Sequence, residues 1–302
     1  MTRIGCRLNA TRLACATAVA LLPPFMDVRA QSLTYVGSTL FSTGDYTFAT
    51  RTSSLYIANG LSARLGRVRA SVLVPLIAQD AGWVQYSGGG ILPTGGMPGH
   101  GSGDSNGTGS RTGSMDDGRM MSRDGDGMSG HLGIGDPLAR ADVELVHEGE
   151  WSPAIRVVGA ARAPLAGTGT GYGTGRWDFG SGVSASKAVG GIFLFADATY
   201  WRLGDTPDLP LRNTVAYAAS AGRFLGSLRL SILGSVNGYS SVLRGVAGPV
   251  QAGLTMGYHW ASGRAFTVST AFGLTPSAPD VTLGAGWQVP LWTAGHVIRG
   301  DP

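Results

Sequence analysis

The chain has 302 residues, and only 14% of them are charged, against about 25% in ordinary soluble domains. Glycine contributes 49 residues and Lys187 is the only lysine, which argues against the charge-dense helical surface of a standard soluble enzyme. The hydrophobic fraction is 43% and the mean hydropathy is +0.10, yet no uninterrupted apolar stretch reaches the roughly 18 to 20 residues of a membrane-spanning helix. These values exclude a highly charged disordered chain and a helical membrane protein.

Residues 1–30 are predicted to be a secretory signal peptide. Arginines at 3, 7 and 12 precede an apolar stretch at 13–22, and the small residues Val28 and Ala30 predict cleavage before Gln31. Cleavage leaves 19 basic and 18 acidic residues, so the formal charge falls from +4 to +1. The sequence pI of about 9.3 therefore owes much to the leader, and we predict no nucleic-acid partner.

Both cysteines, Cys6 and Cys15, lie in this leader. The mature chain then has no thiol for a disulfide bond, a zinc site or a nucleophile. An exported chain without thiols and without a spanning helix belongs to the periplasm, the medium or the outer membrane of a Gram-negative bacterium.

From about Ser32 onward, apolar residues fall at every second position, which is the period of a strand with two different faces. In the segment 251–260, for example, Leu254, Met256 and Tyr258 alternate with Thr255 and Gly257. Twelve such strands are predicted, at 33–43, 53–65, 68–80, 132–146, 152–164, 176–187, 191–202, 212–223, 227–237, 250–260, 264–274 and 280–291.

The connections between these strands separate a membrane barrel from a soluble sandwich. Tight turns such as 65–67 and 189–191 alternate with longer connections such as 81–130 and 204–211. Transmembrane barrels have this asymmetry, with short periplasmic turns and longer extracellular loops. We predict an all-β fold, a transmembrane antiparallel up-and-down β-barrel of about twelve strands at 31–292, with a large flexible loop at about 81–130 and a tail at 293–302.

Aromatic residues near the predicted strand ends are placed as interfacial girdles should be. They are Tyr200, Trp201, Tyr258, Trp260, Trp287 and Trp292.

If the apolar positions face lipid, the alternate positions face the lumen. On the segment 132–146 these are charged, with Arg140, Asp142 and Glu144 in alternation. The predicted lumen-lining residues are Arg69, Arg140, Asp142, Glu144, Arg156, Asp178, Asp197 and Arg229. Two interpretations stay open: charges that set the selectivity of a restricted pathway, or an ion-pair network that only stabilises a polar interior. A twelve-stranded interior is wider than a side-chain-filled eight-stranded one and narrower than an open porin.

Five segments carry a resemblance to a known family. They are Gly-Ile-Gly-Asp-Pro at 133–137, the segment at 163–169, Gly-Thr-Gly-Arg-Trp-Asp-Phe at 173–179, Ser186-Lys187, and the segment at 200–205. This stretch, about Gly133 to Asp205, resembles the outer-membrane barrel family named for the phenol meta-degradation pathway. The resemblance implies a channel or transporter for passive uptake or efflux of small compounds, with aromatic or hydrophobic ones as candidates. The first hundred residues carry no matching motif, and Trp292 would have to serve as the terminal aromatic assembly signal from inside the chain.

Other classes of function are considered beside transport. A structural or adhesive barrel would need no site, whereas an outer-membrane hydrolase would need a nucleophile and base in reach. His100, His147 and His259 lie in separate regions without a recognisable serine. The segment 87–130 carries five methionines and His100, a copper-like donor set, although a disordered surface loop also explains it.

We therefore predict no catalytic residue, no metal and no cofactor, and outer-membrane lipid and a small-molecule solute as partners. The sequence leaves the oligomeric state open.

Overall fold

The computed structural model describes residues 31–46, 49–79, 131–166, 175–204, 212–225, 229–242 and 244–293. The predicted signal peptide, the loop at 81–130 and residues 294–302 lie outside these ranges. The strands are β1 (Ser32–Tyr46), β2 (Ala49–Leu65), β3 (Val68–Gln79), β4 (His131–Ile134), β5 (Leu138–Val146), β6 (Ala154–Arg162), β7 (Asp178–Val189), β8 (Ile192–Arg202), β9 (Thr214–Leu225), β10 (Leu230–Tyr239), β11 (Val250–His259), β12 (Ala265–Gly273) and β13 (Val281–Thr293).

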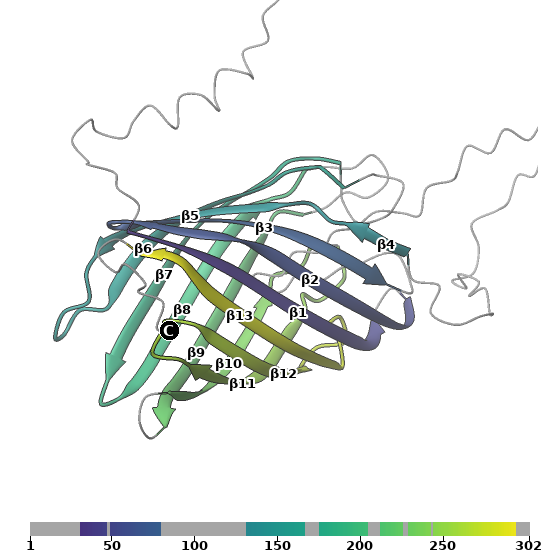
Figure 1. Ribbon diagram of the computed structural model, residues 1–302. Coiled ribbons are helices and arrows are strands. Elements are labelled where there is room, and N and C mark those ends of the chain that lie inside the picture. Colours follow the sequence, from purple (N-terminus) through teal and green to yellow (C-terminus); the bar gives the residue numbers. More distant parts are fainter. Residues whose placement is uncertain are drawn as a thin grey trace, which may run out of the picture.

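The strands form one closed antiparallel barrel (Figure 1). Strands that follow one another in the chain pair along the wall, β2 with β3 included. The last strand, β13, pairs with β1 and closes the ring. Because β4 and β5 both pair with β3, they act as a single interrupted strand. The barrel therefore has twelve strands around its wall, which confirms the predicted fold class and strand number.

The predicted strand at 132–146 is interrupted at residues 135–137, contrary to expectation. Pro137 lies in the interruption and Pro75 lies opposite on β3, and neither proline has an N–H to donate to the ladder. One backbone hydrogen bond, from Gly135 N to Pro75 O at 2.9 Å, crosses this part of the wall. On either side of the interruption, β4 and β5 both run antiparallel to β3.

The connections alternate in length as the sequence predicted, with one exception: β1 and β2 extend beyond the predicted 33–43 and 53–65, and only residues 47 and 48 separate them. One end of the barrel carries short turns, in which Gly66, Gly190 and Gly191 have φ values of 63°, 57° and 80°. Such positive φ values favour glycine because it has no Cβ. The short-turn end lies at the left of Figure 1.

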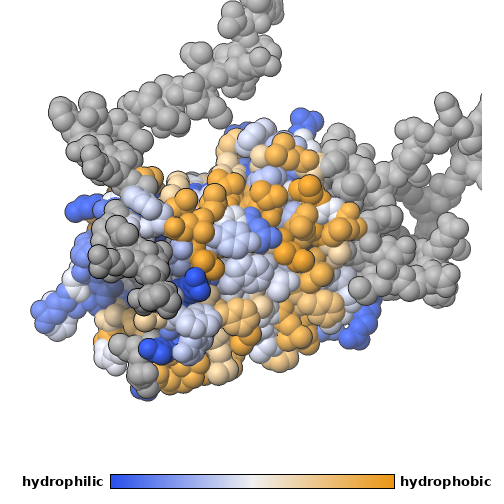
Figure 2. All heavy atoms as spheres, viewed as in Figure 1, coloured by the Kyte–Doolittle hydropathy of each residue, from blue (hydrophilic) through white to orange (hydrophobic). Residues whose placement is uncertain are grey.

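The outer surface of the barrel is apolar. Large hydrophobic side chains alternate outward, as Leu254, Val268 and Phe272 do with exposed fractions of 45%, 48% and 55%. Figure 2 shows hydrophobic residues over much of the visible wall and hydrophilic residues mostly toward its two ends. No helix in the described ranges is long and apolar enough to cross a membrane.

One predicted girdle residue points the other way. Tyr200, Tyr258, Trp260 and Trp292 are 37 to 49% exposed on the wall, but Trp201 is only 4% exposed. Its ring packs against Gly180 on the lumen side, where any Cβ would collide with it. Trp201 is therefore a lumen residue, and the prediction that it belongs to an interfacial girdle was wrong.

Candidate functional site

The candidate site is the lumen of the barrel. It contains a cavity of about 400 Å³, lined from all sides by residues of strands that include β1, β3, β5, β8, β11 and β12. A second cavity of about 320 Å³ shares five lining residues with the first, so the two adjoin. The shared residues are Leu40, Asp197, Ala216, Thr255 and Ser269.

The two halves of the lumen wall differ in charge. The ladders place acidic and basic residues on the inner face of β3 and of β5 to β8. At the inward strand positions of β1 and β9 to β13, the described chain carries no Asp, Glu, Lys or Arg; Ser, Thr, Gly and Ala predominate there. One side of the lumen is therefore charged, and the other is lined with hydroxyls and small residues.

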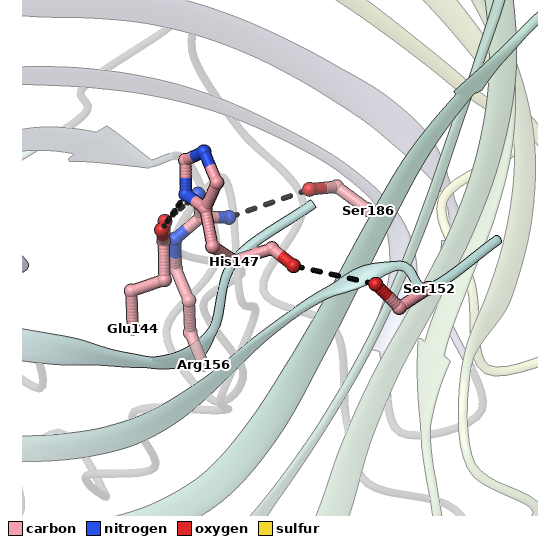
Figure 3. A network of polar contacts seen from close by, with 5 residues as sticks. All are labelled: Glu144, His147, Ser152, Arg156 and Ser186. Carbon is pink, nitrogen blue, oxygen red and sulfur yellow. Dashed lines mark hydrogen bonds and ion pairs between the residues drawn. The ribbon is translucent and has the colours of Figure 1, made fainter. Parts of the chain in front are cut away.

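Glu144, Arg156 and Ser186 form a network with His147 near the short-turn end (Figure 3). The Glu144 carboxylate lies 2.6 Å from both His147 Nδ1 and Arg156 Nη2, and Arg156 Nη1 donates to Ser186 Oγ at 3.4 Å. Ser152 Oγ donates to the His147 backbone oxygen at 3.5 Å. We call this set the rim network; it joins β5, β6, β7 and the turn after β5. Within it, Glu144 and Arg156 neutralise each other as an ion pair.

A second polar set lies at the end with the longer connections. Arg162 Nε donates to Asp178 Oδ2 at 2.7 Å, and Gly204 N donates to Asp178 Oδ1 at 2.7 Å. Ala166 N donates to Asp136 Oδ1 at 2.8 Å, and Arg162 attracts the Asp136 carboxylate. These five residues are the anchor cluster.

The anchor cluster holds a segment of chain inside the barrel. Ala166, four residues beyond the end of β6, is buried against Tyr56 and Ala58 of β2 and Ile77 of β3, all on lumen-facing positions of their strands. Residues 163–166 therefore turn inward and cover part of the lumen opening. The Asp136 carboxylate holds this segment through the backbone N–H of Ala166.

The motif segments behind the family resemblance contribute to the anchor cluster. Asp136, Ala166, Asp178 and Gly204 come from four of the five segments and meet in space although they are far apart in sequence. Their fifth member, Arg162, was not among the predicted site residues. Alternation along the strand nevertheless predicts that Arg162 faces the lumen, as Arg156 of β6 does.

Arg140 and Asp197 face the larger cavity directly. They attract each other electrostatically, but within the described residues neither has a hydrogen bond or an ion pair within 4 Å. Arg140 lies opposite Ser71 and Ala160 in the ladders, and Asp197 opposite Ser184 and Ala218. They differ in this respect from Glu144, Arg156 and Asp178, whose charges are matched by close partners.

The other predicted lumen residues lie away from the cavities. Arg69 and Asp142 are opposite each other on β3 and β5; Asp142 is 8% exposed, whereas Arg69 is exposed. Arg229 lies just before β10, where it is exposed and its backbone oxygen accepts from His259 N at 2.7 Å. Arg229 is thus at the rim of the barrel.

One contact was not foreseen from the sequence. Ser231 Oγ lies 3.0 Å from His259 Nε2, and the Phe224 ring packs edge-on against the His259 ring at 5.2 Å between centroids. A Ser–His pair is the core of a hydrolytic site, but such sites also hold the second imidazole nitrogen with an orienting group. The described residues provide His259 with no carboxylate partner, and they contain no group of three or more His, Cys, Asp or Glu that could hold a metal.

No protein-family model and no curated protein matches the sequence. Among solved structures, the chain is similar to the COG4313 outer membrane channel from Pseudomonas putida F1, with a TM-score of 0.57 and 11% identity over 89% of this chain and 99% of that one. It also matches the CymD monoaromatic hydrocarbon channel (TM-score 0.43, 8% identity, 87% and 88% of the two chains) and the beta domain of the Bordetella autotransporter BrkA (0.42, 10%, 85% and 98%). The first similarity shows that the chain has the fold of an outer-membrane β-barrel.

Proposed function

We propose that the mature chain is an outer-membrane channel for the passive passage of small solutes. The observation that carries the proposal is the pair of adjoining cavities inside a closed barrel whose outer wall is apolar. A barrel that served only as an anchor or adhesin would have no need of a lumen with free charges facing open space. The inward segment at 163–166 makes the passage a restricted one.

The proposal includes the predictions from the sequence on export, orientation in the membrane, family and solute. Residues 1–30 act as a cleaved export signal, and the short turns face the periplasm. The stretch from Gly133 to Asp205 supports membership of the family named for the phenol meta-degradation pathway, since its motif residues contribute to the anchor cluster. That family resemblance makes aromatic or hydrophobic compounds the candidate solutes.

Single-channel recording tests the proposal. Residues 31–302 would be refolded, checked for heat-modifiable migration and inserted into a planar bilayer in KCl. Discrete conductance steps, together with swelling of solute-loaded liposomes, are the expected result. A correctly folded barrel that gives neither would overturn the proposal in favour of an adhesive or structural role. Hydrolysis of lipid without conduction, lost in Ser231→Ala, would favour an enzyme instead.

A further inference from the structure

Two opposite charges face the larger lumen cavity. Among the lining residues of both cavities, Arg140 and Asp197 are the only Asp, Glu, Lys, Arg or His. Arg140 lines the larger cavity and Asp197 lines both. The remainder of the lining consists of hydroxyl, small, apolar and amide residues, with Tyr217 and Trp201 as the aromatic members.

The barrel geometry keeps these charges apart. Arg140 is on β5 and Asp197 is on β8, with β6 and β7 between them in the wall. Three strand spacings correspond to about 14 Å along the wall. The two side chains attract each other across the space, but no ion pair joins them within the described chain. Buried or partly buried opposite charges are ordinarily paired, because an isolated charge in a low-dielectric site is costly.

A third polar group on β8 lies near them. Thr199 is 4% exposed, lies two residues from Asp197 on the same face, and lines the larger cavity. Its hydroxyl has no hydrogen-bond partner among the described residues. That hydroxyl oxygen is itself buried against the wall, so a solute in this cavity would meet one cation and one anion, Arg140 and Asp197.

We propose that the larger cavity is a binding subsite for small zwitterionic solutes, with Arg140 receiving the anionic group and Asp197 the ammonium group. An ω-amino acid with a short carbon chain has two opposite charges separated by a chain of methylenes. Its apolar carbons would lie against the small and apolar lining. A solute with one charge satisfies one of the two residues and leaves the other without a counter-charge, so it binds more weakly. The inference rests on the proposed channel function, and it names a solute class other than the aromatic or hydrophobic compounds that the family resemblance implies.

Equilibrium binding measures the preference for a zwitterion over singly charged solutes, and it does not require conduction. The refolded chain in detergent micelles would be titrated with 5-aminopentanoate and, as singly charged analogues of the same length, with pentanoate and pentylammonium, using saturation-transfer NMR. We expect the zwitterion to bind about tenfold more tightly than either analogue. A series from glycine to 6-aminohexanoate would show the chain length that best spans the two charges.

Substitutions test whether Arg140 and Asp197 are the residues that bind the zwitterion. Arg140→Gln and Asp197→Asn should each reduce the affinity for 5-aminopentanoate about tenfold, to that of the singly charged analogues. The matched controls are Arg223→Gln, an exposed arginine on the lipid face of β9, and Asp280→Asn, an exposed residue of the connection before β13; both should bind as wild type does. The charge exchange Arg140→Asp with Asp197→Arg should recover part of the affinity, because a zwitterion can bind in the reverse orientation.

Equal affinity of the wild-type barrel for the zwitterion and its two analogues would overturn the inference, even if a variant failed to fold. Unchanged affinity in both folded single variants would overturn it as well. A barrel that conducts but shows no such preference keeps the channel function and loses the zwitterion subsite. A barrel that binds the zwitterion but does not conduct keeps the subsite and loses the channel function.

Discussion

Arg162 and Asp178 lie opposite each other on β6 and β7, with side-chain exposures of 4% and 0% and a separation of 2.5 Å between Arg162 Nη2 and Asp178 Oδ2. Both are lumen-facing positions, yet burial here is close to that of a protein interior. The second Asp178 oxygen accepts the N–H of Gly204, so the carboxylate also fixes the start of the connection after β8. A pair in this position stabilises the barrel end rather than attracting a solute.

Removing one partner of this pair should be costly. We expect Asp178→Asn to lower the free energy of unfolding by about 3 to 5 kcal/mol, because it leaves the Arg162 charge buried without its counter-ion. Urea titration of the refolded barrel, followed by tryptophan fluorescence, measures the change. The double substitution Arg162→Met with Asp178→Leu, which removes both charges, should cost less than the single one. An unchanged unfolding midpoint for Asp178→Asn would contradict the buried pair.

At the scale of elements, two features shape the lumen: alternation along each strand, and the inward segment at 163–166. Alternation places Leu254 on the outer wall and its neighbours Gly253 and Thr255 at the cavities. The inward segment is held at its start by the Ala163 N–H, which donates to the Pro137 oxygen, and at its end by the Asp136 carboxylate, which accepts the N–H of Ala166. Each feature leads to a separate measurement.

The segment should move when its anchor is removed. We expect Asp136→Ala to raise the single-channel conductance above that of wild type, because Ala166 loses the hydrogen bond that holds the end of the segment over the lumen. Recording under identical salt and voltage measures the step size. Asp280→Asn, which changes an exposed carboxylate, serves as the control and should conduct as wild type does. Equal step sizes in all three proteins would show that the segment does not limit the current.

The outer face of β11 should not tolerate a charge. Leu254→Arg is expected to lower the free energy of unfolding by about 2 to 4 kcal/mol if the position lies near the bilayer midplane. Ser235→Arg on β10 is the matched control, since Ser235 lines the smaller cavity and its replacement would face the lumen. Unfolding in lipid vesicles compares the two. Equal losses in both variants would mean that lipid does not contact this face.

At the scale of the whole molecule, the barrel has one charged inner wall and one wall of hydroxyl and small residues. The charged wall contains both signs, and the rim network and the anchor cluster each neutralise some of them. We therefore expect ion selectivity to depend on the balance of charges around the lumen rather than on any single residue. Open space remains beside the wall of small side chains.

Shifting this balance should change ion selectivity. Asp142→Asn combined with Glu144→Gln removes two negative charges from the inner wall, and we expect the channel to become more selective for anions. The reversal potential in a KCl gradient measures the shift. Glu148→Gln with Glu150→Gln makes the same charge change on the turn between β5 and β6 and should have a smaller effect. If the first pair left the reversal potential unchanged, these positions would not line the conducting path.

Much of the barrel could be predicted from local pattern. Alternation predicted the outward positions such as Leu254 and Met256, and the lengths of the connections predicted which ends lie together. The errors arise where a residue depends on a neighbour from another strand. Trp201 was assigned by its place near a strand end, but the neighbouring Gly180 leaves room for its ring on the lumen side. The strand at 132–146 is interrupted at Pro137, opposite Pro75 of β3, and no single segment contains both prolines.

The fold class could be predicted from local pattern, because a period of two is a property of each strand alone and the twelve segments repeat it. The sequence by itself also predicted the side of the wall on which Arg140 and Asp197 lie. Only the tertiary structure decided which charges are paired and which face open space, since pairing depends on residues brought together by barrel closure. The contacts of Asp136 with Ala166 and of Asp178 with Gly204, and the proximity of Ser231 to His259, join residues 26 to 30 positions apart, and alternation carries no information about such distances.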